Sequence, residues 1–463
     1  MKNFLYGTTA LIAVGLVAGG AAAQQAAPAK AAAEPLKLSI TGNWQMFAGF
    51  GKQSEAYNSS TGGPGTASQT GAGKRNHGIQ REGEVHFMGQ TTLANGTKVG
   101  LKVELEAQGF ADNGAVSTAG FDGTAQSRNT ANQASTNRNS SQIDESVAWF
   151  DASWGRLEFG ATWGPGLKMQ YGGYNPIPNF GNLQNNGFVQ YPSAAPESAT
   201  VAVNTYNVIS GKNDKVALYT PRVYGLQFGM SYTPEGGVDG RQGGESGTTY
   251  GFQYRDTTGQ QSQIMEYGLN YVNKFGGVDL ALFASLAQAK LERGIPTGGS
   301  TDTILSNDDR QSWALGANVK MFGVELGGSF KHDNRGLKNP TRDRDQWEVG
   351  VGYTMGPASF GVQYLESKAD DLNVTTAASS NHTKHTDRLS MWQIGGTYNL
   401  GPGIDLIGGV QLVDVKNGCT TSGTGTTGAG GCALATSTAS SKNVIDIQNQ
   451  QATTVVFGTR LRF

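Results

Sequence analysis

The last twelve residues, ATTVVFGTRLRF, restrict the fold more than any other stretch of the chain. Their odd-numbered positions carry Thr453, Val455, Phe457, Thr459, Leu461 and Phe463. Their even-numbered positions carry Thr454, Gly458, Arg460 and Arg462, with Val456 as the apolar exception. A period of two predicts a β-strand with one apolar and one polar face. Because the chain ends on an apolar aromatic residue, we expect a partner to hold this strand in a sheet.

The first strand predicted from the sequence, Leu38 to Gly51, has the same pattern and is the expected partner. Its apolar side chains alternate with Ser39, Thr41, Asn43 and Gln45. Two half-polar terminal strands can pair at the seam of a closed barrel, which leaves no strand edge facing lipid. The sequence therefore predicts an all-β antiparallel transmembrane barrel.

Composition agrees with many amphipathic strands and excludes several other classes. With 37% hydrophobic residues and a mean hydropathy of -0.37, the chain is too polar for a helical membrane protein. Its 68 glycines, 16 tyrosines, 19 phenylalanines and 7 tryptophans are not typical of disorder. The formal net charge of -1 supplies no basic field, so we expect no nucleic-acid partner.

The N-terminal region divides into two segments before the predicted barrel, which covers residues 37–463. Residues 1–23 have the pattern of a signal peptide: Lys2, an apolar core from Ala10 to Val17, and small residues at 21–23. Residues 24–36 form an Ala/Pro-rich lead-in. The protein is thus predicted to be exported. Cys419 and Cys432 are expected to form one disulfide in an oxidising compartment, with two unpaired thiols as the alternative.

The clearest hairpin joins Val85–Leu93 to Thr97–Gln108 through Asn95-Gly96, a pair that favours a tight turn. One face of the hairpin is apolar. The other carries charged residues that a soluble core could not hold but a water-filled lumen could. The pore-wall candidates are Glu82, Glu84, His86, Lys98, Lys102, Glu104 and Glu106, together with Arg460 and Arg462 on the last strand. Each could shape the field in the pore or simply neutralise a neighbour.

The same unit, a strand, a short turn, a strand and a long polar loop, recurs along the chain. Seven hairpins and the two terminal strands make sixteen strands of about ten residues, an even number typical of such barrels. Aromatic residues lie in or beside most of the short turns, as an interfacial girdle requires: Trp154, Tyr224, Phe275, Phe322, Phe360 and Tyr398. The segment 52–80 is predicted to be a long loop. In Arg388–Asn399, the alternation of apolar and polar residues shifts by one position near Trp392.

Six stretches of the chain form a recognisable series when they are taken in order: LSITGNWQMFAGFG, VHFMGQTTLANGTKVGLKVELEAQ, SVAWFDASWGRLEFGATWGPG, KVALYTPRVYGLQFGMSYTP, YNLGPGIDL and the terminal VFGTRLRF. Together they resemble the motifs of the general-diffusion porins of Gram-negative outer membranes. The resemblance implies a homotrimer of sixteen-stranded barrels in the outer-membrane lipid that passes small hydrophilic solutes and ions passively. It also implies that the barrel-assembly machinery reads Phe463.

The resemblance further implies that the loop after the fifth strand, about residues 164–211, folds inward and forms a constriction. The candidate constriction residues are Lys168, Tyr171, Tyr174, Asn182, Asn185 and Glu197. Many relatives place several carboxylates on this loop, whereas this chain has almost none before Glu197. Its amides and tyrosines would instead favour neutral solutes through hydrogen bonds.

Other chemistries have weaker support in the sequence, and we expect no catalysis, cofactor or metal. The glycine-rich GTGTTG at 423–428 lacks the strand and helix that a dinucleotide site requires. His382 and His385 could clip a metal but have no further ligand cluster. An outer-membrane hydrolase would need a nucleophile beside His86, and no such motif flanks it. A substrate-selective channel remains an alternative to a general one.

Overall fold

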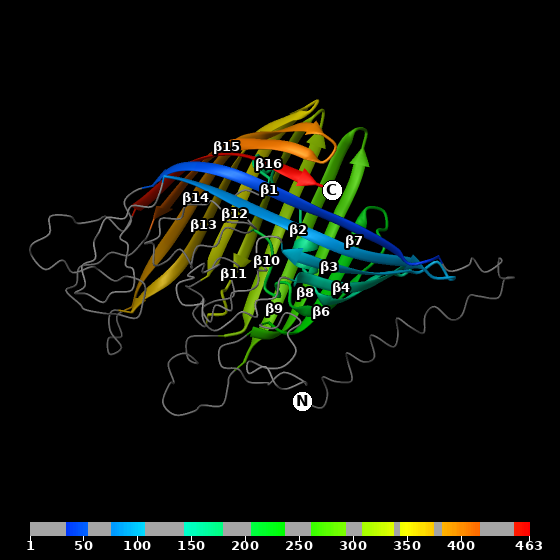
Figure 1. Ribbon diagram of the computed structural model, residues 1–463. Coiled ribbons are helices and arrows are strands. Elements are labelled where there is room, and N and C mark those ends of the chain that lie inside the picture. The colour runs from blue at the N-terminus through cyan, green and yellow to red at the C-terminus, as the bar shows by residue number, and fades with distance from the viewer. Residues whose placement is uncertain are drawn as a thin grey trace, which may run out of the picture.

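The computed structural model describes residues 34–53, 76–106, 143–178, 205–236, 261–292, 308–337, 343–374, 382–416 and 449–463. Within them, sixteen antiparallel strands close into one barrel (Figure 1). The strands are β1 Lys37–Gln53, β2 His77–Thr92, β3 Lys98–Glu106, β4 Ile143–Ala152, β5 Gly155–Ala161, β6 Asp214–Tyr219, β7 Leu226–Glu235, β8 Gln261–Phe275, β9 Val278–Leu291, β10 Arg310–Met321, β11 Val324–Asp333, β12 Arg344–Met355, β13 Ala358–Val374, β14 His382–Gly401, β15 Ile404–Lys416 and β16 Asn449–Arg462. A four-residue helix, α2 Pro165–Lys168, follows β5. In the part of the chain that the structure describes, no helix is long and apolar enough to cross a membrane.

The two terminal strands form the predicted seam. β1 pairs with β16 in an antiparallel register that sets Trp44 opposite Leu461 and Phe50 opposite Val455. The ladder reaches the last residue, because the Phe463 amide donates to the Gly42 carbonyl (3.1 Å) and the Gly42 amide donates to the Phe463 carbonyl (2.9 Å). The closed sixteen-stranded barrel predicted from the sequence is therefore confirmed.

Apolar and polar side chains occupy opposite faces of the sheet, as the alternation predicts. On β16, Val455 and Phe457 are exposed on the outside, whereas Thr454 is buried on the inside. Buried polar residues recur on the inner face of most strands, including Gln45, Glu104, Glu266, Glu348 and Gln411. An apolar outside and a polar inside are typical of a barrel that crosses a membrane around an aqueous lumen.

Short turns gather at one end of the barrel. They join β2 to β3, β4 to β5 and each later even-numbered strand to the next, so all seven lie at the end where β1 starts and β16 stops. The aromatic residues predicted there are exposed, from 49% for Tyr398 to 92% for Tyr224. This placement agrees with an aromatic girdle at a membrane interface.

Three sequence predictions about the strands were wrong in detail. Several strands exceed ten residues, and β14 has 20. β2 already begins at His77, so the predicted loop 52–80 ends earlier. No register slip occurs at Trp392, since the β14 ladder continues through it to a shift between Asn399 and Gly401.

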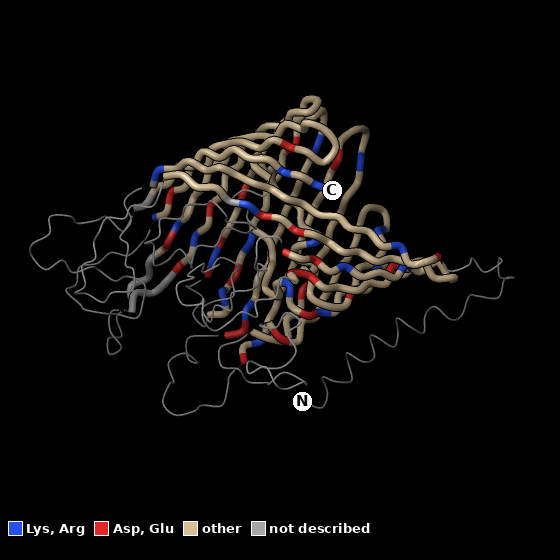
Figure 2. Tube along the Cα trace, viewed as in Figure 1, with Lys and Arg blue, Asp and Glu red and all other residues tan. Residues whose placement is uncertain are grey.

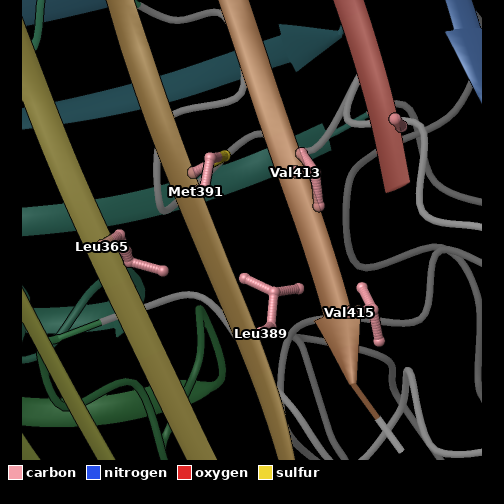
Figure 3. Close-up of a cluster of buried hydrophobic side chains, with 6 residues drawn as sticks. Leu365, Leu389, Met391, Val413 and Val415 are labelled. Carbon is pink, nitrogen blue, oxygen red and sulfur yellow. The ribbon is translucent and has the colours of Figure 1, made fainter. Parts of the chain in front are cut away.

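The apparent slip at Trp392 arises from apolar residues on the inner face. Leu389 and Met391 are buried there, while Trp392 faces outward at 47% exposure. Leu389 and Met391 belong to a cluster of buried apolar side chains that extends over β13–β16 (Figure 3): Leu365, Leu389, Met391, Val413, Val415 and Ala452. A strand with apolar residues on both faces loses its alternation in the sequence although its pairing is regular.

Candidate functional site: the lumen wall and the β5–β6 loop

The described parts of the β5–β6 connection, residues 162–178 and 205–213, lie against the inner face of the barrel. Helix α2 contacts β7, β8 and β9. Met169 packs with Phe283 of β9, and the Asn318 amide of β10 donates to the Gly172 carbonyl (2.9 Å). Further along, Ile177 is fully buried against Phe47, Ile407 and Val456. The segment thus follows the wall from β7 to the seam, and it accounts for the apolar Val456 on an otherwise polar face.

The segment lies this close to the wall because glycines occur where it passes. A Cβ on Gly268 would lie 3.0 Å from Met169 Sδ, and one on Gly409 would lie 2.5 Å from Ile177 Cδ1. A Cβ on Gly316 would overlap the Tyr171 carbonyl oxygen, and one on Gly350 would overlap that of Tyr174. We call this set the glycine belt: Gly229, Gly268, Gly316, Gly327, Gly350, Gly352, Gly361, Gly395 and Gly409.

Register aligns the glycine belt across the sheet. Gly229 pairs directly with Gly268, and Gly327 with Gly350. Gly361 pairs with Gly395, which pairs with Gly409. Because paired residues lie side by side, the glycines form a shallow track along the wall in which a backbone can approach closely. The alternation of polar and apolar residues within single strands did not predict this track.

The returning segment 205–213 is held by polar groups of the same part of the wall. The hydroxyls of Thr205 and Ser329 are 2.6 Å apart, and the Asn207 amide donates to Ser285 Oγ (2.8 Å). The backbone N–H of Ser210 donates to Glu266 (3.1 Å). Burial raises the pKa of the Tyr206 hydroxyl in this segment well above its ordinary value, so it stays neutral.

Lys215, at the start of β6, joins the two ends of the loop. Its ammonium donates to the carbonyl of Thr162, where the loop begins, and to those of Gly211 (2.9 Å) and Asn213 (2.7 Å), where it ends. The side chain is 3% exposed. A buried ammonium that meets three carbonyls is well solvated by the protein and fixes their spacing.

A second region, on β2–β4, carries most of the predicted pore-wall charges. We call it the charged wall; its inward residues are Glu82, Glu84, His86, Lys102, Glu104, Glu106, Asp144 and Glu145. Register sets Glu84 opposite Glu106 and His86 opposite Glu104. Charged residues lie along many strands of the barrel and not only at its rims (Figure 2).

Two lysines neutralise part of the charged wall. Lys102 Nζ lies 2.8 Å from Glu104 and also donates to Glu145. Lys212, from the end of the β5–β6 loop, lies 3.3 Å from Glu104 and pairs with Asp144. Asp144, Glu145 and Lys212 were absent from the sequence prediction, because their strand pairing and loop contact are not visible in the order of residues.

A family comparison identifies the protein class. The model of the Gram-negative porin family matches residues 7–418. The chain belongs to the Gram-negative porins. It is therefore a channel protein of the Gram-negative outer membrane and not an enzyme. Membrane lipid surrounds the barrel, and solutes pass through it.

A solved porin structure shares its barrel. The anion-selective porin from Comamonas acidovorans aligns with 93% of this chain and 100% of its own at a TM-score of 0.50 and 15% identity. The outer-membrane protein OmpT of Vibrio cholerae aligns with 93% of this chain and 98% of its own at a TM-score of 0.47 and 10% identity. At 15% identity, the similarity to the Comamonas acidovorans porin shows only that the two proteins share a fold. No similar sequence was found among curated proteins.

The remaining predicted site residues of the porin differ in their exposure and in their contacts. Lys98 starts β3 at the short-turn end and is exposed. Arg460 and Arg462 lie 2.8 and 2.9 Å from Asp405, an acceptor that the sequence prediction missed. Of the constriction candidates, Lys168 pairs with Glu158 (2.6 Å), and Tyr171 and Tyr174 lie on the glycine belt.

Several predictions concern residues outside the described part of the chain. They are the signal peptide, most of the lead-in, the loop residues Asn182, Asn185 and Glu197, and the disulfide between Cys419 and Cys432. These stay predictions.

Proposed function

We propose that this porin is a general-diffusion channel whose narrowest passage lies between the β5–β6 loop and the charged wall. Within the described residues, the loop contacts β5–β16 and Phe47 of β1 along its length. It meets β3 and β4 only near its two ends: Lys212 pairs with Glu104 and Asp144, and Thr162 and Trp163 donate to Glu145. Glu84, His86 and Lys102 keep about a fifth of their side-chain surface exposed. This division supports an aqueous path along β2–β4, with residues 164–211 as the constriction.

Passage through such a gap needs no energy input and no substrate-specific site. Solutes small enough to pass would be small hydrophilic molecules and ions, sorted by size and by the charges that they meet. No feature of the described residues favours a substrate-selective channel over a general one.

We expect a preference for cations. The charged wall holds six carboxylates, and Lys102 and Lys212 pair with three of them, Glu104, Asp144 and Glu145. In a planar bilayer with a KCl gradient, the reversal potential should show that K⁺ passes more readily than Cl⁻. In Glu84→Gln the permeability ratio should fall by up to about fivefold, since one charge near the path contributes on the order of 1 kcal/mol.

Asp279→Asn is the matched control, because Asp279 is half exposed in an ion pair with Lys274 next to the β8–β9 turn. It should leave the ratio unchanged. An anion preference in the unmodified channel, or equal shifts in both variants, would contradict the proposed path. A correctly folded protein that conducts no ions would contradict an open channel.

We further propose that the chain assembles as a homotrimer and that the barrel-assembly machinery reads Phe463. The trimer proposal rests on family membership, and conductance steps that arrive in threes would support it. The side chain of Phe463 is 63% exposed, while its backbone closes the seam with Gly42. An exposed terminal ring is accessible to another protein.

Phe463→Ala should therefore lower the amount of folded porin in the outer membrane of cells several-fold, yet refold normally in detergent. The measurement is heat modifiability on gels for both preparations. The reverse pattern, with poor refolding in detergent and normal assembly in cells, would show that the ring stabilises the barrel and is not an assembly signal.

A further inference from the structure

The side chains of Glu84, His86 and Glu104 converge on one point of the lumen wall. Glu84 Oε2 lies 3.0 Å from His86 Nε2, which lies 3.2 Å from Glu104 Oε2. One ligand atom from each of the three residues lies within 4.8 Å of the other two. Bonds of about 2.1 Å around a metal ion place neighbouring ligand atoms roughly 3.0–3.5 Å apart, so this spacing suits a shared ion.

The barrel brings the three side chains together through its register. Glu84 and His86 are two residues apart on β2, so both point inward. His86 is directly opposite Glu104 of β3. Residues paired in this way have Cβ atoms about 5 Å apart, which lets short side chains meet at one ion.

Two features of this cluster favour a cation over a simple ion-pair network. Two carboxylate oxygens approach the same nitrogen of His86, and a single N–H cannot point well at both. Glu84 also faces Glu106 directly across the strands, and its contacts in the described structure are Asn43 (3.0 Å) and His86, with no ammonium or guanidinium group.

We propose that Glu84, His86 and Glu104 form a binding site for a divalent transition-metal ion of the Zn²⁺ class in the channel. One imidazole and two carboxylates suit Zn²⁺, whereas Mg²⁺ and Ca²⁺ prefer oxygen ligands throughout. Lys102 competes with the metal, because its ammonium already lies 2.8 Å from the same oxygen of Glu104. A metal bound here would stand beside the proposed path and reduce the current.

Direct binding is the first test, because it does not depend on conduction. Refolded protein in detergent would be titrated with Zn²⁺ by equilibrium dialysis. We expect His86→Gln to weaken binding at least about tenfold and Lys102→Gln to strengthen it. His332→Gln is the matched control. His332 also lies near two carboxylates, Asp345 at 2.7 Å and Asp343 at 3.6 Å, but among the described residues it forms no convergent set of three.

Zn²⁺ binding that is the same in His86→Gln and the unmodified porin would overturn the proposal, as would binding that His332→Gln abolishes. If His86→Gln fails to fold, the unmodified protein still decides the matter. Bound Zn²⁺ should protect His86 from diethylpyrocarbonate, as mapped by mass spectrometry, and equal modification with and without Zn²⁺ would contradict the site.

The current supplies a second readout. Micromolar Zn²⁺ should lower the conductance of the unmodified channel but not that of His86→Gln. Binding without a change in current would leave the metal site intact and would count against the proposed path beside the charged wall, so the two ideas fail separately.

Discussion

Lys215→Met should destabilise the folded porin by about 3 kcal/mol or more. The substitution keeps an unbranched side chain of similar length but removes the ammonium that meets the carbonyls of Thr162, Gly211 and Asn213. Each buried carbonyl that loses its donor costs on the order of 1 kcal/mol or more. Glu266, which is 1% exposed and interacts electrostatically with Lys215, would lose its nearby cation as well.

Urea unfolding in detergent micelles, followed by tryptophan fluorescence, measures this loss. Lys274→Met is the control, since Lys274 forms an exposed ion pair with Asp279 and should change stability by less than about 1 kcal/mol. Because Lys215 joins the two ends of the loop, we also expect noisier single-channel current in Lys215→Met. Equal unfolding midpoints for the two variants would show that the three carbonyls are satisfied without Lys215.

A Gly316→Ala/Gly350→Ala variant should detach the β5–β6 loop from the wall. The added methyl groups would overlap the carbonyl oxygens of Tyr171 and Tyr174, and a backbone cannot move aside as the end of a flexible side chain can. Since the opposite side of the segment is the proposed passage, the displaced loop would enter it. We expect the mean conductance to fall by half or more and the current to occupy several levels.

Gly408→Ala is the matched control. Gly408 lies next to Gly409 on β15, but a Cβ there would meet its nearest atom at 3.5 Å, an ordinary contact. The control should conduct like the unmodified channel. Steady, unreduced current in the double variant, with folding verified by heat modifiability, would show that the loop does not need the glycine belt.

The sequence predicted the barrel well because its signals are local. Alternation within one strand identifies its two faces, and Asn95-Gly96 or Phe322-Gly323 identifies a turn without knowledge of the rest of the chain. Both terminal strands, the seven short turns and the exposed aromatic residues beside them were predicted in this way. Prediction failed at Leu389 and Met391, where apolar residues face inward and remove the alternation.

The functional features depend on contacts between residues far apart in the sequence. Asp405 meets Arg460 and Arg462 from the neighbouring strand, and His86 meets Glu104 only because of the β2–β3 register. The glycine belt draws one or two residues from each of eight strands. In a chain with 68 glycines, no single one of them stands out from the others. Strand pairing must therefore be known before these groups can be recognised.

The glycine belt also limits how such a channel can diversify. The half of the wall that holds the loop has little freedom to accept new side chains, since even a methyl group would collide with the loop backbone at several positions. In the described residues, β2–β4 meet the loop only near its ends, through Lys212, Thr162 and Trp163, so substitutions elsewhere on these strands can alter charge and size without moving the loop. To engineer a sensor or filter with a new preference for ions or solutes, β2–β4 are therefore the strands to randomise. The strands that hold the loop should be left unchanged.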